Sequence, residues 1–247
     1  MERMMKKWFW LLLACLVSPA WSAAPSPVLI HLYSLDYPPF IIGEPGTAQR
    51  GIAQEAVQAA LAKAGMQGQW MDVPWKRAQL QVQGDEYACL LPLTRSPKRE
   101  DLYRWIAVID SSGQSLFVRA GNVQGIHSLA DLKGKRVVAL LGSSMAEWLR
   151  QHQVEFAELP AAKDGYRELS LGVADAWAVH SPVARYLVKQ QGRKAVAIQE
   201  VLRLQETQIY IACGKRMPDE AAKRLADAFR QLRESGELER ITARYLD

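Results

Sequence analysis

The segment LLPLTRSPKRE, residues 90–100, gathers side chains that together could bind an anion. It opens with an apolar stretch that predicts a buried strand, and Pro92 is expected to end that strand. Ser96 followed by proline is typical of the cap and first position of a helical turn, which leaves backbone N–H groups unpaired. Arg99 beside such amides and the Thr94 hydroxyl predicts a receptor for a carboxylate or a phosphate. A basic, solvated loop is the alternative that this segment alone leaves open.

The first half of the chain alternates segments typical of strands with segments typical of helices. Apolar periodicity predicts strands over 28–33, 69–73 and 87–91, and helices over 51–64 and 75–83. Each of three proline-containing loops follows a predicted strand: Pro38-Pro39, Pro74-Trp75 and Pro92–Arg99. Because the carboxyl ends of parallel strands share one edge of a sheet, we expect these loops to converge there.

The same alternation restarts after Gly121 and predicts a second α/β unit. Strands are expected over 135–141, 155–159, 174–179 and 195–198, and helices over 128–134, 145–151, 163–171, 182–190, 219–234 and 237–245. Two similar extended segments, 115–119 and 208–213, are candidates for the chain crossing to the second lobe and back. The predicted division is a signal peptide over 1–24, a first lobe over 25–112 plus 207–247, and a second lobe over 113–206. A cleft between two such lobes suits a small ligand clamped by closure.

The N-terminal residues have the layout of a secretory signal peptide. Arg3, Lys6 and Lys7 precede an apolar run over residues 8–17, and small residues follow near position 22. A membrane-spanning helix needs about 20 apolar residues, so a lasting anchor is the weaker interpretation. We therefore expect a periplasmic protein. A lipoprotein processed at Cys15 is the minority alternative.

Composition excludes several classes of function. The chain has 247 residues, is 49% hydrophobic and carries a formal net charge of +5, without a basic run interleaved with aromatics that would indicate nucleic-acid binding. Its four histidines are scattered and no Cys-x-x-Cys occurs, so neither a metal site nor a cofactor is expected. Cys89 and Cys213 both lie in apolar, strand-like segments, and whether they pair or remain free buried thiols stays open.

Several motifs together resemble the family 3 bacterial extracellular solute-binding proteins, the polar amino-acid-binding components of ABC importers. They are the leader, Tyr37-Pro38-Pro39-Phe40 followed by Gly51, Thr94 with Ser96–Arg99, Asp131–Lys135 with Gly142-Ser143-Ser144, and Gly236, Ile241 and Tyr245 in the last helix. The likeness covers nearly all of the chain after the leader. It implies a periplasmic-binding-protein type II fold, in which each lobe is a mainly parallel sheet flanked by helices and two hinge strands join the lobes. It also implies a monomer that serves an ABC permease in the inner membrane.

The resemblance assigns four ligand-binding positions. Tyr37 matches the aromatic that walls the ligand side chain, and Thr94 matches a hydroxyl that holds the ligand's amino end. Arg99 matches the arginine that forks onto the α-carboxylate, and Ser144 matches the group that caps the same carboxylate at a helix N-terminus. The alternatives are a core tyrosine, a surface arginine and an ordinary helix cap, respectively, for Tyr37, Arg99 and Ser144.

One position departs from the family pattern. Amino-acid binders of this family usually have an aspartate about five residues after the Asp175-Ala176 pair, where it binds the ligand ammonium, but this chain has His180. An imidazole supplies no fixed negative charge, which puts a standard α-amino acid in doubt. Arg77 is a further cation that is expected either to face the cleft or to be an exposed helix residue. If it faces the ligand together with Arg99, an acidic or multi-carboxylate solute is favoured. Trp75 is expected either to stack on the ligand or to pack on the sheet.

The leading hypothesis is a periplasmic protein that captures a small polar carboxylate, an amino acid or a derivative, by lobe closure. Two alternatives remain. One is a periplasmic enzyme of the cyclohexadienyl-dehydratase type, with His180 and Glu147 as conceivable proton carriers. The other is a ligand-sensing domain that docks to a membrane partner.

Overall fold

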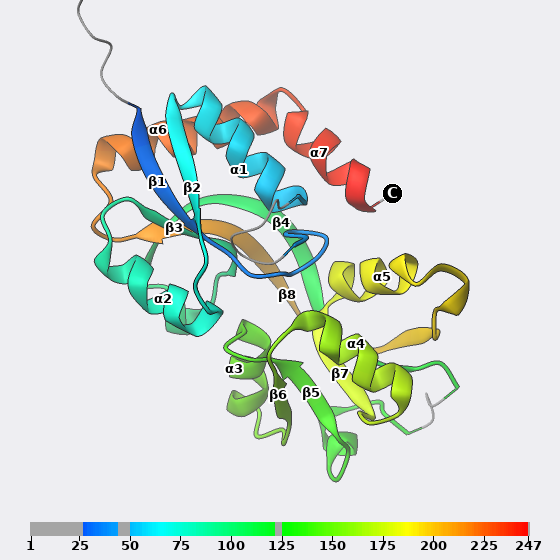
Figure 1. Cartoon of the computed structure of the whole chain (residues 1–247). Coiled ribbons are helices and arrows are strands. Elements are labelled where there is room, and N and C mark those ends of the chain that lie inside the picture. The colour runs from blue at the N-terminus through cyan, green and yellow to red at the C-terminus, as the bar shows by residue number, and fades with distance from the viewer. Residues whose placement is uncertain (1–26, 44–49, 122–124, 247) are drawn as a thin grey trace, which may run out of the picture.

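Two long strands connect the two halves of the molecule. The computed structural model describes residues 27–43, 50–121 and 125–246, in which eight strands form one sheet of order β2-β1-β3-β8-β4-β7-β5-β6. The central strands β4 (Tyr103–Arg119) and β8 (Ile198–Gly214) each have 17 residues and pair antiparallel along their length. They run from one lobe into the other (Figure 1). They contain the two segments predicted to cross between the lobes.

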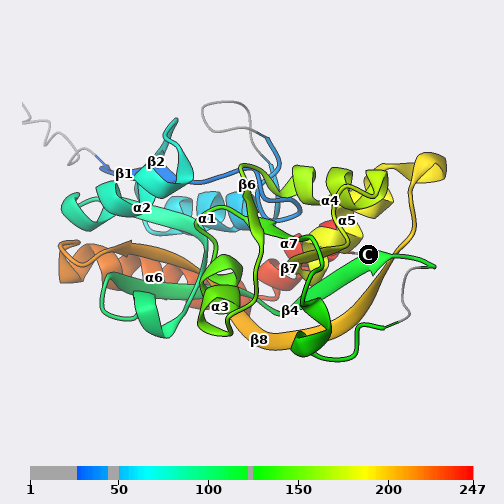
Figure 2. The same cartoon turned by 90° about the horizontal axis from the view of Figure 1, so that it is seen from below.

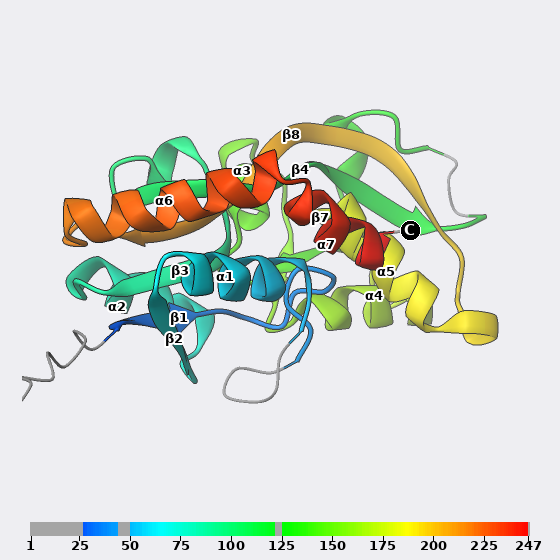
Figure 3. The same ribbon diagram turned by 90° about the horizontal axis from the view of Figure 1, so that it is seen from above.

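The first lobe covers both faces of its sheet with helices. Its strands are β1 (Val28–Tyr33), β2 (Met66–Met71) and β3 (Ala88–Thr94), and β1 pairs parallel with the other two. One face packs on α1 (Ile52–Lys63), α6 (Asp219–Glu234) and α7 (Glu237–Leu246), which lie together in Figure 3. The other face packs on α2 (Trp75–Gly84) through Ala78 and Val82.

The second lobe repeats this arrangement. Its strands are β5 (Val137–Leu140), β6 (Ala157–Leu159) and β7 (Ala176–His180), and β5 pairs parallel with both others. Alternate residues of β5 enter different cores: Val138 packs with α4 (Ala162–Leu171) and α5 (Ser181–Gln190), whereas Val137 packs with α3 (Ser144–Gln151). In Figure 2, α4 and α5 accordingly lie apart from α3. Because both faces of β5 are buried in this way, its sequence is apolar without interruption.

Short 3₁₀ helices occupy three connections: η1 (Pro97–Arg99), η2 (Leu129–Leu132) and η3 (Gly192–Lys194). The predicted turn after Ser96 is therefore confirmed as η1. A capping box between Ser128 and Asp131 begins η2 where a capped helix was expected.

Two sequence-based expectations are wrong in detail. β3 does not end at Pro92 but continues to Thr94, because a register shift against β8 between Leu90 and Leu93 accommodates a residue without an N–H. The predicted strand over 195–198 does not form as such: η3 ends at Lys194, residues 195–197 are irregular, and β8 begins at Ile198. The parallel strands of each lobe follow the prediction, and the hinge strands join the two lobes into one sheet whose three central pairings are antiparallel.

A disulfide ties the first lobe to the hinge. Cys89 of β3 and Cys213 of β8 are opposed in register and form a disulfide with a sequence separation of 124. The question that the sequence left open is thus answered in favour of pairing. The predicted signal peptide and Cys15 lie outside the described residues. No helix within the described part of the chain is long and apolar enough to cross a membrane.

Candidate functional site

The strand ends of both lobes meet at a small cavity. Six of the seven predicted site residues line it, and its full lining is Leu35, Tyr37, Trp75, Pro92, Thr94, Arg99, Leu140, Ser143, Ser144 and His180. Thr94 ends β3, His180 ends β7, and Ser144 begins α3 directly after β5. The cavity has a volume of only about 30 Å³, and a solute larger than a water or two requires the lobes to move apart.

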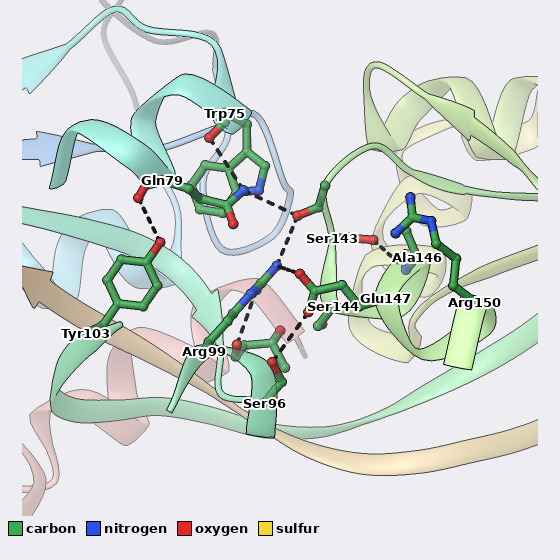
Figure 4. A network of polar contacts seen from close by, with 12 residues as sticks. Trp75, Gln79, Ser96, Arg99, Tyr103, Ser143, Ser144, Ala146, Glu147 and Arg150 are labelled. Carbon is green, nitrogen blue, oxygen red and sulfur yellow. Dashed lines mark hydrogen bonds and ion pairs between the residues drawn. The ribbon is translucent and has the colours of Figure 1, made fainter. Parts of the chain in front are cut away.

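Arg99 is the charged centre of the first-lobe side. Its side chain is only 4% exposed, and the end of β3 and the η1 turn hold it between the lobes. Nη1 donates to the Thr94 carbonyl (3.3 Å), and Nη2 donates to the Gly142 carbonyl (3.0 Å) and to Oε1 of Glu147 (3.0 Å). The Nε–H is buried and has no partner among the described residues. Figure 4 shows the guanidinium between its own loop and the first turn of α3.

The α3 N-terminus supplies the facing wall. Gly142 has a φ of 67°, a conformation that glycine adopts without strain, and its carbonyl also accepts from Gln79 Nε2 (3.3 Å) of α2. Ser143 is the helix cap, because its Oγ accepts from the Ala146 N–H (3.1 Å). The alternative that made Ser144 the ordinary cap is therefore wrong. Ser144 is buried and its Oγ accepts instead from Gln114 Nε2 (2.8 Å).

His180 is neutral and saturated with hydrogen bonds. Burial lowers the pKa of its imidazole to about 3. Gln205 Nε2 donates to Gln114 Oε1 (2.7 Å), which turns the Gln114 amide nitrogen toward His180 Nε2 (3.0 Å). Because that amide nitrogen only donates, Nε2 accepts and the ring proton resides on Nδ1. Nδ1 then donates to the Tyr37 oxygen (2.7 Å).

Tyr37 faces the cavity with its hydroxyl and the first-lobe core with its ring. The ring stacks on Phe40 at 6.2 Å and meets His180 edge-on at 5.8 Å. Burial raises the pKa of the phenol well above its usual value, so the hydroxyl keeps its proton. Since its oxygen accepts from His180, the O–H of Tyr37 remains able to donate toward the cavity. Tyr37 thus lines the cavity and also packs in the first-lobe core, and its contact with a ligand stays a prediction.

The predicted cation Arg77 and the neighbouring Arg95 both lie outside the small cavity, and Arg95 lines the larger cavity described below. Arg77 is exposed on α2 and does not line the cavity, so the structure does not bring it together with Arg99. Arg95 points away from the small cavity: it forms an ion pair with Glu100, and its guanidinium carbon lies 5.5 Å from the centre of the Trp105 ring. Trp75 lines the cavity at the start of α2 and also packs on the first-lobe core.

A larger cavity of about 730 Å³ adjoins the small one. The two share Thr94 and Ser144. The larger one extends along α3 and the hinge strand β8, and its walls are rich in amide and hydroxyl side chains: Ser96, Ser111, Gln151, Gln205, Thr207 and Gln208. A solute anchored at Arg99 therefore has space for a polar extension beyond Ser144.

Sequence reasoning missed two residues at this site. Gln114, on the hinge strand, sets the tautomer of His180, and nothing in its sequence neighbourhood distinguishes it. Glu147, raised only as a proton carrier, proves to be the ion-pair partner of Arg99. Its position three residues after Ser144 was an available signal, because such residues share one face of a helix.

Known proteins resemble this chain in both sequence and structure. The L-cystine-binding protein TcyJ of Escherichia coli (strain K12) is 25% identical over 213 residues, which cover 85% of this chain and 79% of that protein. The solved structure of a histidine kinase sensor domain with similarity to periplasmic binding proteins matches with a TM-score of 0.78 and 21% identity, covering 90% of this chain and 97% of that one. The amino acid ABC transporter substrate-binding protein AbpA from Streptococcus pneumoniae, bound to L-arginine, matches with a TM-score of 0.77 and 19% identity, covering 90% and 94%.

At these identities the two structures show the fold alone, and they confirm the predicted type II periplasmic-binding-protein architecture. The family assignment rests on the sequence. The model of the bacterial extracellular solute-binding proteins, family 3, matches residues 29–247, which is nearly the whole chain after the predicted leader. The chain therefore belongs to that family, as its motifs predicted.

Proposed function

We propose that this protein binds an amino acid or a close derivative between its lobes in the periplasm and delivers it to an ABC permease. The observation that carries this proposal is Arg99, a guanidinium buried at the cleft whose Nε–H has no partner in the part of the chain that the structure describes. A buried donor without a partner costs free energy, and a solute carboxylate would satisfy it. Family membership and the L-cystine-binding relative support the same class of solute.

Binding proceeds by lobe closure in this proposal. Contacts between the lobes already surround the anchor, since Gln79 and Arg99 both donate to the Gly142 carbonyl. When the lobes open, these contacts break and Arg99 becomes accessible. A carboxylate that enters would then accept from Arg99 and from the hydroxyls of Tyr37 and Ser144, and closure would remove it from water.

A thermal-shift screen of residues 25–247 tests the proposal. The panel holds the twenty amino acids, L-cystine, the deaminated analogue of each, and di- and tricarboxylates. A solute that binds only the folded state raises the melting temperature by mass action. We expect at least one amino acid or derivative to do so, and silence across the panel would remove the proposed solute class.

Substitution at Arg99 tests the anchor. Arg99→Lys keeps the charge but loses the fork, and we expect the affinity for the stabilising solute to fall about 10- to 100-fold, the range of a hydrogen bond to a charged group. Arg77→Ala is the matched control, because it removes a cation from the same lobe outside the cavity. Full affinity in the Arg99 variant would contradict a carboxylate anchored there.

We infer binding and not catalysis, because both candidate proton carriers are already engaged. His180 has its Nε2 occupied by Gln114 and its Nδ1 proton directed at Tyr37, and the carboxylate of Glu147 pairs with Arg99. Incubation with prephenate or arogenate is therefore expected to leave both compounds unchanged. Formation of a dehydrated product would revive the enzymatic alternative.

A sensing role is the second candidate, since the fold matches that of a histidine kinase sensor domain. In that case the solute would close the lobes, and the closed protein would dock onto a membrane partner. Pull-down of a purified ABC permease, and not of a sensor kinase, by the solute-loaded protein is the outcome expected from transport.

A further inference from the structure

The cleft contains one buried cation and one carboxylate in direct contact. Glu147 projects from the first turn of α3, and its side chain is 15% exposed. Its Oε1 lies 3.0 Å from Nη2 of Arg99, while Oε2 accepts only a long hydrogen bond from Ser96 Oγ (3.4 Å). Figure 4 shows this carboxylate reaching across the gap between the lobes. The anchor expected for a solute carboxylate is thus already paired with a carboxylate of the protein.

Other groups of the cavity supply no negative charge. His180 is buried and neutral, and its one accepting nitrogen faces Gln114. Among the residues that line the small and the large cavity, the carboxylates are Glu147 and Glu206. Glu206 is 67% exposed and forms an ion pair with Arg203. Glu147 is therefore the carboxylate available to a solute held at Arg99.

The contrast between donors and acceptors points the same way. The Nε–H of Arg99 has no partner among the described residues, and the hydroxyl of Tyr37 retains a proton to donate. Two donors are therefore available to the carboxylate of a solute. A positively charged half requires an acceptor, preferably a charged one. Arg95 and Glu206 of the larger cavity pair with Glu100 and Arg203, respectively. The remaining charges, Arg99 and Glu147, are one positive and one negative, and this balance matches a zwitterion better than an anion.

We propose that Glu147 binds the ammonium group of the solute, so that the Arg99–Glu147 pair is a receptor for a zwitterion. This rests on the proposed function, which it deepens by naming the charge pattern of the solute. Without solute the two side chains neutralise each other; with solute one ion pair is exchanged for two, and no charge is left unpaired. A carboxylic acid without an amine would displace Glu147 from Arg99 and leave its carboxylate partly buried without a positively charged partner, which is costly.

Paired ligands and a charge-removing variant test the assignment. The probes are the panel amino acid that stabilises the protein most and its deaminated analogue, in which hydrogen replaces the α-ammonium (for glutamine, 4-carbamoylbutanoate). Calorimetric titration measures both dissociation constants for wild type, Glu147→Gln and Glu155→Gln. The last variant is the matched control, because it removes an exposed carboxylate from the same lobe outside both cavities.

In wild type and the control we expect the amino acid to bind at least about 10-fold more tightly than its deaminated analogue. In Glu147→Gln the amino acid should lose about 10- to 100-fold in affinity, and its advantage over the analogue should vanish. Glu147→Asp, which keeps the charge on a shorter side chain, should weaken the amino acid and not the analogue. That variant preserves the test if the glutamine variant folds poorly.

Opposite outcomes are clearly separated. If Glu147 merely competes with the solute for Arg99, its neutralisation will strengthen the binding of amino acid and analogue alike, and the proposal is overturned while the solute-binding function stands. If the wild-type protein binds deaminated acids and no amino acid, the role proposed for Glu147 is likewise overturned and the solute-binding function stands. No response of wild type to any panel compound would remove the proposed function itself.

Discussion

The ends of β3 and β7 meet in the cleft but differ in whether their polar groups already have hydrogen-bond partners. At the end of β3, Thr94 leads to Arg99, a cation with an unpartnered donor. At the end of β7 stands His180, a neutral ring with both nitrogens engaged. The end of β3 thus keeps an unsatisfied donor for a solute, whereas the imidazole at the end of β7 is occupied by Tyr37 and Gln114. Affinity and stability should therefore respond to different residues, even though Thr94 Oγ1 and His180 Nε2 are 3.4 Å apart.

The largest expected effect concerns how each strand is held. β3 is linked covalently to β8 by Cys89–Cys213, whereas β7 is held by hydrogen bonds to β4 and β5 and by side-chain packing. Replacing both cysteines by alanine removes a link that closes a loop of 124 residues, and we expect a loss of up to about 5 kcal/mol in unfolding free energy. Urea unfolding measures it, with Cys15 left intact if present. An unchanged midpoint would mean that the disulfide does not constrain the unfolded chain.

Removal of His180 should separate stability from affinity. His180→Ala leaves Gln114 and Tyr37 without partners in a buried site and also creates a cavity, which should cost about 2–4 kcal/mol. Compared with His180→Ala, Arg99→Lys should lower the unfolding free energy less and the solute affinity more. Denaturant titration measures the unfolding free energy of each variant, and calorimetry measures its affinity for the solute. Equal losses in both properties for both residues would abolish the contrast between the two strand ends.

The pH dependence of stability gives a sharper test of the neutral ring. The folded-state pKa of His180, about 3, lies below its unfolded value of about 6.5, so the folded protein binds fewer protons between these limits. This contribution is fully present above pH 6.5 and is lost as the pH falls toward 3, by up to about 1.4 kcal/mol per pH unit. His180→Asn should flatten the profile of unfolding free energy over that window. An identical slope in both proteins would show that the wild-type imidazole is already charged when folded.

The smallest effects distinguish two adjacent serines. Ser143→Ala removes the α3 cap and should lower stability by about 1 kcal/mol. Ser143 also lines the cavity, but its Oγ is engaged in the cap, so we expect solute affinity to fall less than in Ser144→Ala. Ser144→Ala removes a hydroxyl from the cavity and should reduce affinity more than stability. Thermal unfolding with and without the stabilising solute compares the two. A reversal of these roles would place the solute against Ser143.

Local sequence patterns predicted most elements closely. Apolar spacing located α1, which ends one residue before the predicted limit, and α6 coincides with the predicted 219–234. β5 and β7 were recognisable because both of their faces are buried, so their sequences are continuously apolar. β4 and β8 were only partly found, since their polar central residues cross an exposed hinge where apolar alternation is interrupted. The lobe limits proposed within these two strands stay a prediction.

The sequence by itself determined the elements, the family and most of the side chains that line the cleft, because helical and strand periodicity and short motifs depend on neighbouring residues. Only the tertiary structure decided that Cys89 pairs with Cys213, that Gln114 orients His180, and that Glu147 neutralises Arg99. Arg99 and Glu147 are 48 residues apart in the chain and belong to different lobes. Such contacts arise from the way two lobes close on each other, and the ion pairs and hydrogen bonds they form depend on distances that no local pattern encodes.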